Sequence, residues 1–161
     1  MKINIKNAFI GIVSLISMSF SANSIACPDF SGVFYKCTTG DRVMDVVMGI
    51  NRAKLNVTQV NKNITVDFLG KETTLKIDEI VEVENYSQSQ RATIYSKVYS
   101  SCQNEVLTIE EDSRIVFDSG KVETESSITD VTLKNRKINM KIAQQANGGD
   151  TKKLNITCKK R

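Results

Sequence analysis

The chain has 161 residues, of which 40% are hydrophobic and 25% charged, so it suits one folded domain rather than a disordered polymer or a bundle of membrane spans. It contains no histidine and no tryptophan. Mechanisms that need an imidazole, such as Ser-His or Cys-His catalysis and His-ligated zinc, are therefore excluded. The formal net charge is +4, and two of the lysines lie within residues 1–26. The rest of the chain is nearly neutral and lacks the basic excess typical of nucleic-acid binding.

Residues 1–26 have the pattern of a secretory signal peptide: a short basic start, an apolar stretch over residues 8–20, and small side chains before the expected cleavage site. The apolar stretch is too short to cross a bilayer, which needs about 20 apolar residues. We expect cleavage after Ala26 and a secreted or periplasmic single domain over residues 27–161. A lipid anchor on Cys27 is less favoured, because Ser24 stands where bacterial lipoprotein signals usually carry Leu and because lipidation would leave an odd number of thiols.

All four cysteines, Cys27, Cys37, Cys102 and Cys158, lie in the expected domain. Four thiols in an exported chain predict two structural disulfides. A metal or redox site is less favoured, because the sequence has neither a C-x-x-C pair nor a histidine. Three pairings are possible. We favour Cys27–Cys37, which would fasten the start of the domain across a short loop, together with Cys102–Cys158, which would close a long loop and so give the larger entropic gain.

Beyond residue 27 the hydrophobic pattern has the two-residue period of strands with one buried face; for example, Ile138, Met140 and Ile142 alternate with Asn139 and Lys141. Joints rich in Gly and Asn separate these runs and are too short for parallel crossovers. We therefore predict an all-β fold, an antiparallel up-and-down meander that closes into a barrel of roughly 8–10 strands, with a two-sheet β-sandwich as the alternative. The expected strands cover residues 30–37, 41–48, 53–60, 63–69, 71–78, 80–85, 90–99, 103–110, 113–118, 121–133, 137–145 and 152–159, with a polar turn at 110–113.

The segment Gly32-Val33-Phe34 opens the first expected strand and resembles the Gly-x-Trp signature of lipocalins and other calycin-type barrels, with Phe34 in the place of Trp. The resemblance implies a small exported barrel that holds a small apolar ligand, with the aromatic side chain closing one end. Residues in the inward phase would either fill the barrel or line such a pocket. The candidates for an interior ligand-lining surface are Phe34, Phe68, Ile94, Val98 and Met140.

No motif nominates a catalytic centre, a cofactor or a metal site, since no nucleophile has a base beside it and the acidic run at residues 110–112 lacks the spacing of a calcium loop. We therefore predict a binding protein rather than an enzyme. Its expected partner is a small apolar ligand or an envelope protein, with no nucleic acid and no integral membrane span after signal removal. The alternative function is a protein-interaction module, such as an inhibitor of a secreted or cell-wall enzyme. Tyr95 and Tyr99 share one strand face and would either form its recognition strip or cover the outside of the barrel.

Overall fold

Ten strands and two short helices make up the part of the chain that the computed structural model describes, residues 27–47, 49–68 and 71–161. The predicted signal peptide and its cleavage site lie outside the described residues. Helix α1 (Arg42–Val47) and the 3-10 helix η1 (Ile50–Arg52) separate the first two strands. The strands are β1 (Gly32–Thr38), β2 (Leu55–Val60), β3 (Asn63–Phe68), β4 (Lys71–Lys76), β5 (Ile80–Ser87), β6 (Ala92–Gln103), β7 (Val106–Phe117), β8 (Val122–Lys134), β9 (Lys137–Ala146) and β10 (Lys152–Lys160).

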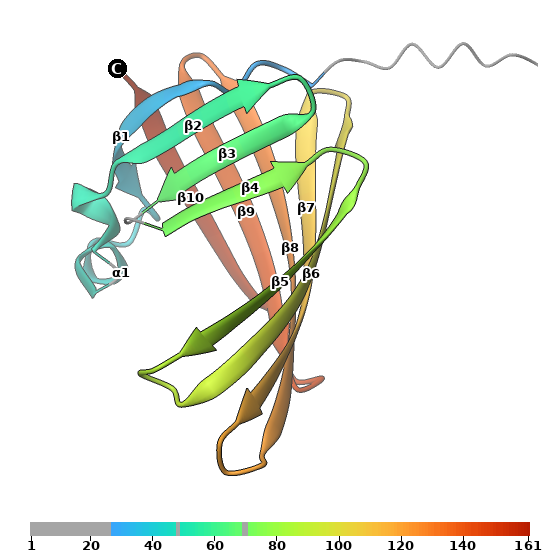
Figure 1. Ribbon diagram of the computed structural model, residues 1–161. Coiled ribbons are helices and arrows are strands. Elements are labelled where there is room, and N and C mark those ends of the chain that lie inside the picture. Colours follow the sequence, from blue (N-terminus) through green and yellow to red (C-terminus); the bar gives the residue numbers. More distant parts are fainter. Residues whose placement is uncertain (1–26, 48, 69–70) are drawn as a thin grey trace, which may run out of the picture.

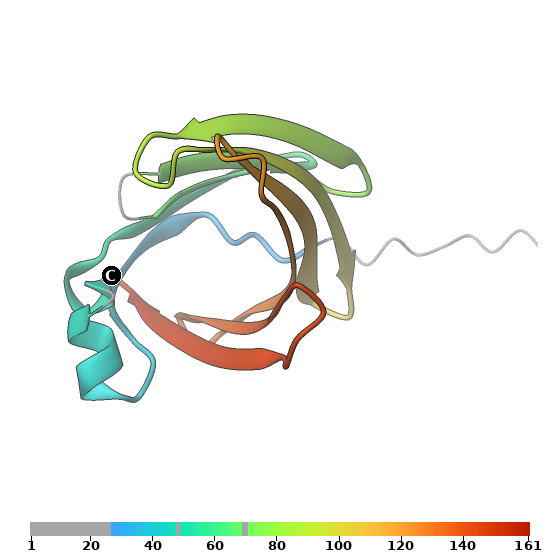
Figure 2. The same ribbon diagram turned by 90° about the horizontal axis from the view of Figure 1, so that it is seen from below.

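All ten strands belong to one antiparallel sheet with the order β4-β3-β2-β1-β10-β9-β8-β7-β6-β5. Figure 2 shows the sheet curled into a nearly closed barrel. The first strand pairs with the last, so β1 and β10 are neighbours inside the sheet. The two ends of the sheet, β4 and β5, meet at one unsealed seam. The predicted up-and-down barrel is confirmed, at the upper end of the expected strand number, and the alternative of a two-sheet sandwich is wrong.

The seam is held together where β4 ends. Ile77 forms a parallel bridge with Ser100 of β6. The Ser100 hydroxyl donates a hydrogen bond to the Lys76 carbonyl at 2.9 Å, and the Asp78 N–H donates to the Ser100 carbonyl at 2.7 Å. Beyond this contact β5 diverges from β4 (Figure 1), and no ladder joins the two strands within residues 71–87. The edge of β5 that faces away from β6 is therefore unpaired along this part of the chain.

The hydrophobic core fills the half of the barrel that the short strands enclose, which we call the closed half. Strands β1–β4 have six or seven residues each, whereas β6–β9 have 10 to 13. The long strands therefore extend past the short ones as a projecting sheet (Figure 1). We call residues 81–97, 112–126 and 145–152 the projecting half. The largest fully buried apolar side chains of the core are Phe30, Phe34, Ile50, Leu55 and Ile64.

The predicted strand over residues 41–48 is wrong, because residues 42–47 form helix α1. Asp41 caps this helix: its Oδ1 accepts the N–H groups of Val43 at 2.8 Å and of Met44 at 3.2 Å. Of the six helical residues only Asp45 is buried. The apolar residues that suggested a half-buried strand are thus turned by the helix toward solvent.

The predicted turn at residues 110–113 is also wrong, because β7 runs unbroken through it. Every residue of this acidic run is paired with β6; Glu110 lies opposite Tyr99, and Asp112 lies opposite Lys97. Cross-strand partners of opposite charge or large apolar area stabilise polar residues on an exposed strand face. The acidic run is therefore part of the sheet and not a hairpin tip.

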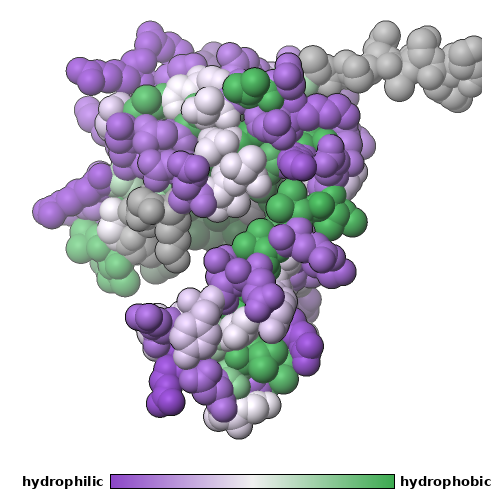
Figure 3. Space-filling view, in the orientation of Figure 1, coloured by the Kyte–Doolittle hydropathy of each residue, from purple (hydrophilic) through white to green (hydrophobic). Residues whose placement is uncertain are grey.

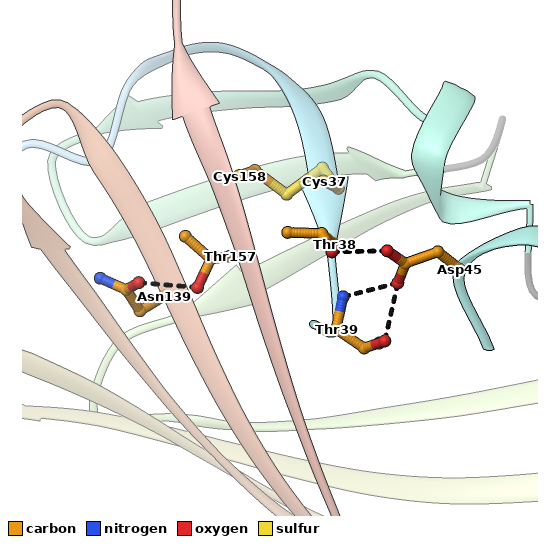
Figure 4. The surroundings of a disulfide bond; sticks show 7 residues. All are labelled: Cys37, Thr38, Thr39, Asp45, Asn139, Thr157 and Cys158. Carbon is orange, nitrogen blue, oxygen red and sulfur yellow. Dashed lines mark hydrogen bonds between the residues drawn. A yellow bond between two sulfur atoms is a disulfide. The ribbon is translucent and has the colours of Figure 1, made fainter. Parts of the chain in front are cut away.

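Two disulfides are present, as predicted, but the favoured pairing is wrong: Cys37 joins Cys158, and Cys27 joins Cys102. Cys37 on β1 and Cys158 on β10 meet because these two strands pair, and their Cα atoms are 4.0 Å apart (Figure 4). The other bridge ties the segment before β1 to the end of β6. Adjacency in the closed barrel, rather than distance along the chain, decides which thiols meet.

Candidate functional site

A solvent-open groove of about 860 Å³, which we call the distal groove, lies on the projecting half. Its residues come from strands β5 to β9 and from the turn between β9 and β10. On β5 to β8 they lie opposite one another in the strand pairing, three consecutive residues from each strand. The groove is lined by Glu82, Val83, Glu84, Tyr95, Ser96, Lys97, Asp112, Ser113, Arg114, Thr124, Glu125, Ser126, Gln145, Asn147 and Gly148.

Most of this lining consists of hydroxyl, amide and charged side chains, and contacts within the sheet hold several of them in place. The hydroxyls of Ser96 and Ser113 hydrogen-bond across β6 and β7 at 2.7 Å. Ser113 also donates to the carboxylate of Glu111 at 3.0 Å. Lys97 Nζ lies 2.9 Å from Glu82 Oε1. Side chains of this kind, fixed in orientation, suit a polar ligand better than an apolar one.

Four carboxylates and two cations are among the residues that line the distal groove. Glu82, Glu84 and Asp112 share one face of the sheet, whereas Glu125 lies on the other face, with Ser96 and Ser113. The hydrogen bond and charge of Glu82 raise the pKa of Lys97, which therefore stays protonated. Glu84 and Asp112 form no ion pair within the described residues. A cationic group would complement these two carboxylates.

Tyr86 of β5 and Tyr95 and Tyr99 of β6 lie on the same face of the sheet. Tyr95 lines the distal groove, whereas Tyr99 lies outside the groove lining, opposite Ile80. Both are exposed, as predicted from their phase. The sequence analysis missed Tyr86, whose hydroxyl donates to Asp118 at 3.1 Å. That hydrogen bond raises the pKa of the Tyr86 phenol, which therefore remains neutral.

The residues predicted to line an interior pocket do not line the distal groove. Phe34 and Val98 are buried in the core. Phe68 and Met140 pack against it, and Ile94 is half-buried in the projecting half. Four of these five residues thus serve as packing around the closed half.

A second groove, of about 620 Å³, lies beside η1 at the other end of β10. We call it the basic groove. Lys160 is tied down within it, because its Nζ donates to the Ser31 carbonyl at 2.6 Å and lies 5.8 Å from the centre of the Phe34 ring. The groove is lined by Tyr35, Lys36, Asn51, Arg52, Ala53, Lys159, Lys160 and Arg161.

Sequence analysis identified only Tyr95 among the residues of the distal groove. Most of the others are polar residues on five strands, and polar residues at alternate positions are ordinary on any solvent-facing sheet. One signal could have pointed to the groove. Ser96 lies on the same face of β6 as Val98, and Ser113 lies on the same face of β7 as Ile115. The two serines therefore mark the place where the inward-facing residues change from apolar to polar.

Within the described ranges, no group of three or more His, Cys, Asp and Glu residues is placed to hold a metal ion. No helix in the same ranges is long and apolar enough to cross a membrane. Comparison of the sequence with protein-family models gives no match, and comparison with curated proteins gives no significant match.

Proposed function

We propose that this protein is an extracytoplasmic binding module that holds an extended, cationic segment of an envelope protein in the distal groove, along the free edge of β5. The observation that carries the proposal is the position of two carboxylates, Glu82 and Glu84, on the strand whose edge is unpaired. An unpaired edge offers backbone donors and acceptors to an added strand. The neighbouring carboxylates would then select the charge of its side chains.

The charge pattern of β5 supports a cationic partner. Glu82 and Glu84 stand at alternate positions, so both point to the same face of the sheet. A strand added beside β5 would place its own side chains about 5 Å from these carboxylates. Lys or Arg at alternate positions would meet Glu84 and would extend the existing ion pair between Glu82 and Lys97. An acidic segment would be repelled.

Two features support the rest of the proposal, a secreted or periplasmic location and the absence of catalysis. The two disulfides fit an oxidising compartment, where such bridges form and persist. The chain has no histidine, and Glu82 keeps Lys97 protonated. The groove therefore lacks the imidazole or free amine that usually activates a hydroxyl nucleophile.

The resemblance to lipocalins supports a second proposal, the carriage of a small apolar ligand inside the barrel. Phe34 is fully buried in the closed half, in keeping with the end-closing role that the resemblance implies for this aromatic residue. We favour the peptide ligand, because Phe34, Phe68, Val98 and Met140 already pack in or against the core. The polar lining of the distal groove points the same way.

The test is fluorescence polarisation with two labelled peptides that match the eight-residue length of β5, one alternating Lys and Val and the other alternating Glu and Val. We expect the Lys-Val peptide to bind and Glu84→Lys to weaken its binding by about tenfold. Glu105→Lys, a charge reversal in the turn between β6 and β7 outside the groove, is the matched control and should bind like the unmodified protein. Equal affinity for both peptides, or no effect of Glu84→Lys, would reject the peptide proposal. A small apolar molecule retained in native mass spectrometry would favour the second proposal instead.

A further inference from the structure

Helix α1 has the opposite orientation to an ordinary surface helix. Its acidic residue, Asp45, faces the protein, whereas Val43, Val46 and Val47 are 71%, 61% and 77% exposed. Residues three and four apart share one face of a helix, so the three valines form a continuous patch, and Met44 flanks it at 41% exposure. We call these four residues the apolar knob. A surface helix normally turns its apolar face inward, so the knob indicates a contact that the isolated domain does not make.

Side-chain contacts fix the helix in this orientation. The Thr38 hydroxyl donates to Asp45 Oδ2 at 2.5 Å. The backbone N–H and the hydroxyl of Thr39 donate to Asp45 Oδ1 at 2.6 and 2.7 Å (Figure 4). Both threonines directly follow Cys37, whose disulfide fastens β1 to β10. The exposed valines therefore belong to an anchored element and not to a frayed one.

The segments next to the apolar knob, and the basic groove, carry cations without acidic partners among the described residues. Within residues 36–54 the only acidic residues are Asp41, which caps the helix, and Asp45, which points inward. The cationic side chains of the region are exposed, and none of those named here forms an ion pair among the described residues. They are Lys36, Arg42, Arg52, Lys54, Lys159 and Arg161.

The apolar knob and these cations lie on one side of the molecule. Helix α1 contacts both β1 and η1, and η1 supplies part of the basic groove. Figures 1 and 2 both place α1, η1 and the C-terminus at the left of the barrel. In Figure 3 the hydrophobic surface over α1 stands at the left edge, with hydrophilic side chains above it. The apolar knob and the basic groove are therefore neighbours on the surface.

We infer that this face docks on the surface of an anionic phospholipid bilayer, with the apolar knob among the acyl chains and the basic groove on the headgroup phosphates. Apolar side chains flanked by Lys and Arg are the combination that holds peripheral proteins at anionic membranes. A protein partner or a second copy of the chain could cover the valines. However, the cations named above lack acidic partners among the described residues, and the phosphates of an anionic bilayer would supply those partners over the whole face. The inference is independent of the function proposed for the distal groove.

The test is cosedimentation of the oxidised protein with vesicles of phosphatidylglycerol and phosphatidylcholine, compared with vesicles of phosphatidylcholine alone. We expect binding to the anionic vesicles only, and weaker binding as salt rises. Replacing Val43, Val46 and Val47 together by Ser should weaken binding about tenfold or more. Lys36→Gln combined with Lys159→Gln should also weaken it by about tenfold at low salt.

Matched controls keep the same chemistry at other places. Ile80→Ser with Ile128→Ser removes exposed apolar side chains from β5 and β8, and Lys152→Gln with Lys153→Gln removes two charges at the far end of β10 from Lys159. Both pairs should bind vesicles like the unmodified protein. An unchanged thermal transition confirms that each variant is folded.

A tryptophan in the apolar knob gives an independent readout, because the chain has none. The emission of Val47→Trp should move to shorter wavelengths when anionic vesicles are added. No binding to these vesicles, equal binding by the triple serine variant, or no shift in emission would overturn the inference. A serine variant that changes only the oligomeric state would also overturn it and would assign the knob to a second copy.

Discussion

Removing the bridge between Cys37 and Cys158 should destabilise the domain strongly, because this bridge joins the first and last strands of the barrel. The bond closes a loop of 121 residues. In the Cys37→Ala/Cys158→Ala variant the other bridge remains and shortens the loop that is released. The shorter path runs from Cys37 back to Cys27, across to Cys102 and on to Cys158, about 66 residues in all.

The magnitude follows from this path. Closing a loop of about 66 residues corresponds to about 4 kcal/mol of loop-closure entropy at 25 °C. Both sulfur atoms are also buried, with Cys37 2% and Cys158 0% exposed, so the cavity left by alanine adds about 1 kcal/mol. For a domain of this size such a loss lowers Tm by about 15 °C. Circular dichroism during urea and thermal unfolding measures both quantities.

The matched variant is Cys27→Ala/Cys102→Ala. It releases a loop of the same effective length, because the same two segments separate its thiols, so its entropic loss is also about 4 kcal/mol. Its cysteines are less buried, and the cavity contribution should be smaller. The reasoning is refuted if the Cys37/Cys158 variant loses less than about 2 kcal/mol, or if the Cys27/Cys102 variant is the less stable of the two. Mass mapping of the oxidised protein should show these two pairs.

Three further changes address other parts of the barrel. Gly32→Ala should lower the free energy of unfolding by about 1–3 kcal/mol in urea titration, because Gly32 has a φ of 153° that L-residues rarely adopt; an unchanged midpoint would contradict this. Ser100→Ala should cost about 1 kcal/mol, since the Lys76 carbonyl at the end of β4 loses the hydroxyl donor and keeps only the longer hydrogen bond from the Glu79 N–H, at 3.3 Å. Hydrogen exchange should then rise at β4 and β5, and a uniform rise would show that the seam is not the weak point. Hydrogen bonds from Thr38 and Thr39 lower the pKa of Asp45, so this anchor of α1 is complete above the unfolded pKa of about 3.9 and is lost as pH falls through the lower folded pKa. Exchange in α1 should rise on acidification, and Asp45→Asn should raise it already at neutral pH; equal exchange in the two proteins at neutral pH would disprove the anchor.

The sheet could be predicted from the sequence because its determinants are local. Ile138 and Met140 of β9 lie opposite Cys158 and Ile156 of β10, so the two-residue period does mark a face that packs on the core. The joints are short, which limits each strand to an antiparallel partner next to it in the chain. Four cysteines in a chain with an export pattern likewise predict two disulfides before any fold is known.

The remaining features depend on contacts between distant segments. Helix α1 forms where Asp45 can reach the end of β1. The spacing of Val43, Val46 and Val47, three and four residues apart after the capping Asp41, is a helix signal that the prediction of a strand overlooked. The pairing of Cys37 with Cys158 requires that β1 lie between β2 and β10, a consequence of barrel closure. The distal groove needs five strands in register, and its residues are unremarkable on each strand alone.

The position of the seam connects this architecture to the proposed function. Strands β1 and β10 are paired and disulfide-bonded, so closure occurs at the two ends of the meander and the break falls in its middle, between β4 and β5. The connection there is only residues 77–79, which keeps the two strands close at one end while the edge of β5 stays accessible. Segments with few buried contacts open at low cost. A strand can therefore add to β5 without disturbing the core, which lies in the closed half. Substitutions in the closed half should accordingly change the free energy of unfolding, and those in the distal groove should change affinity.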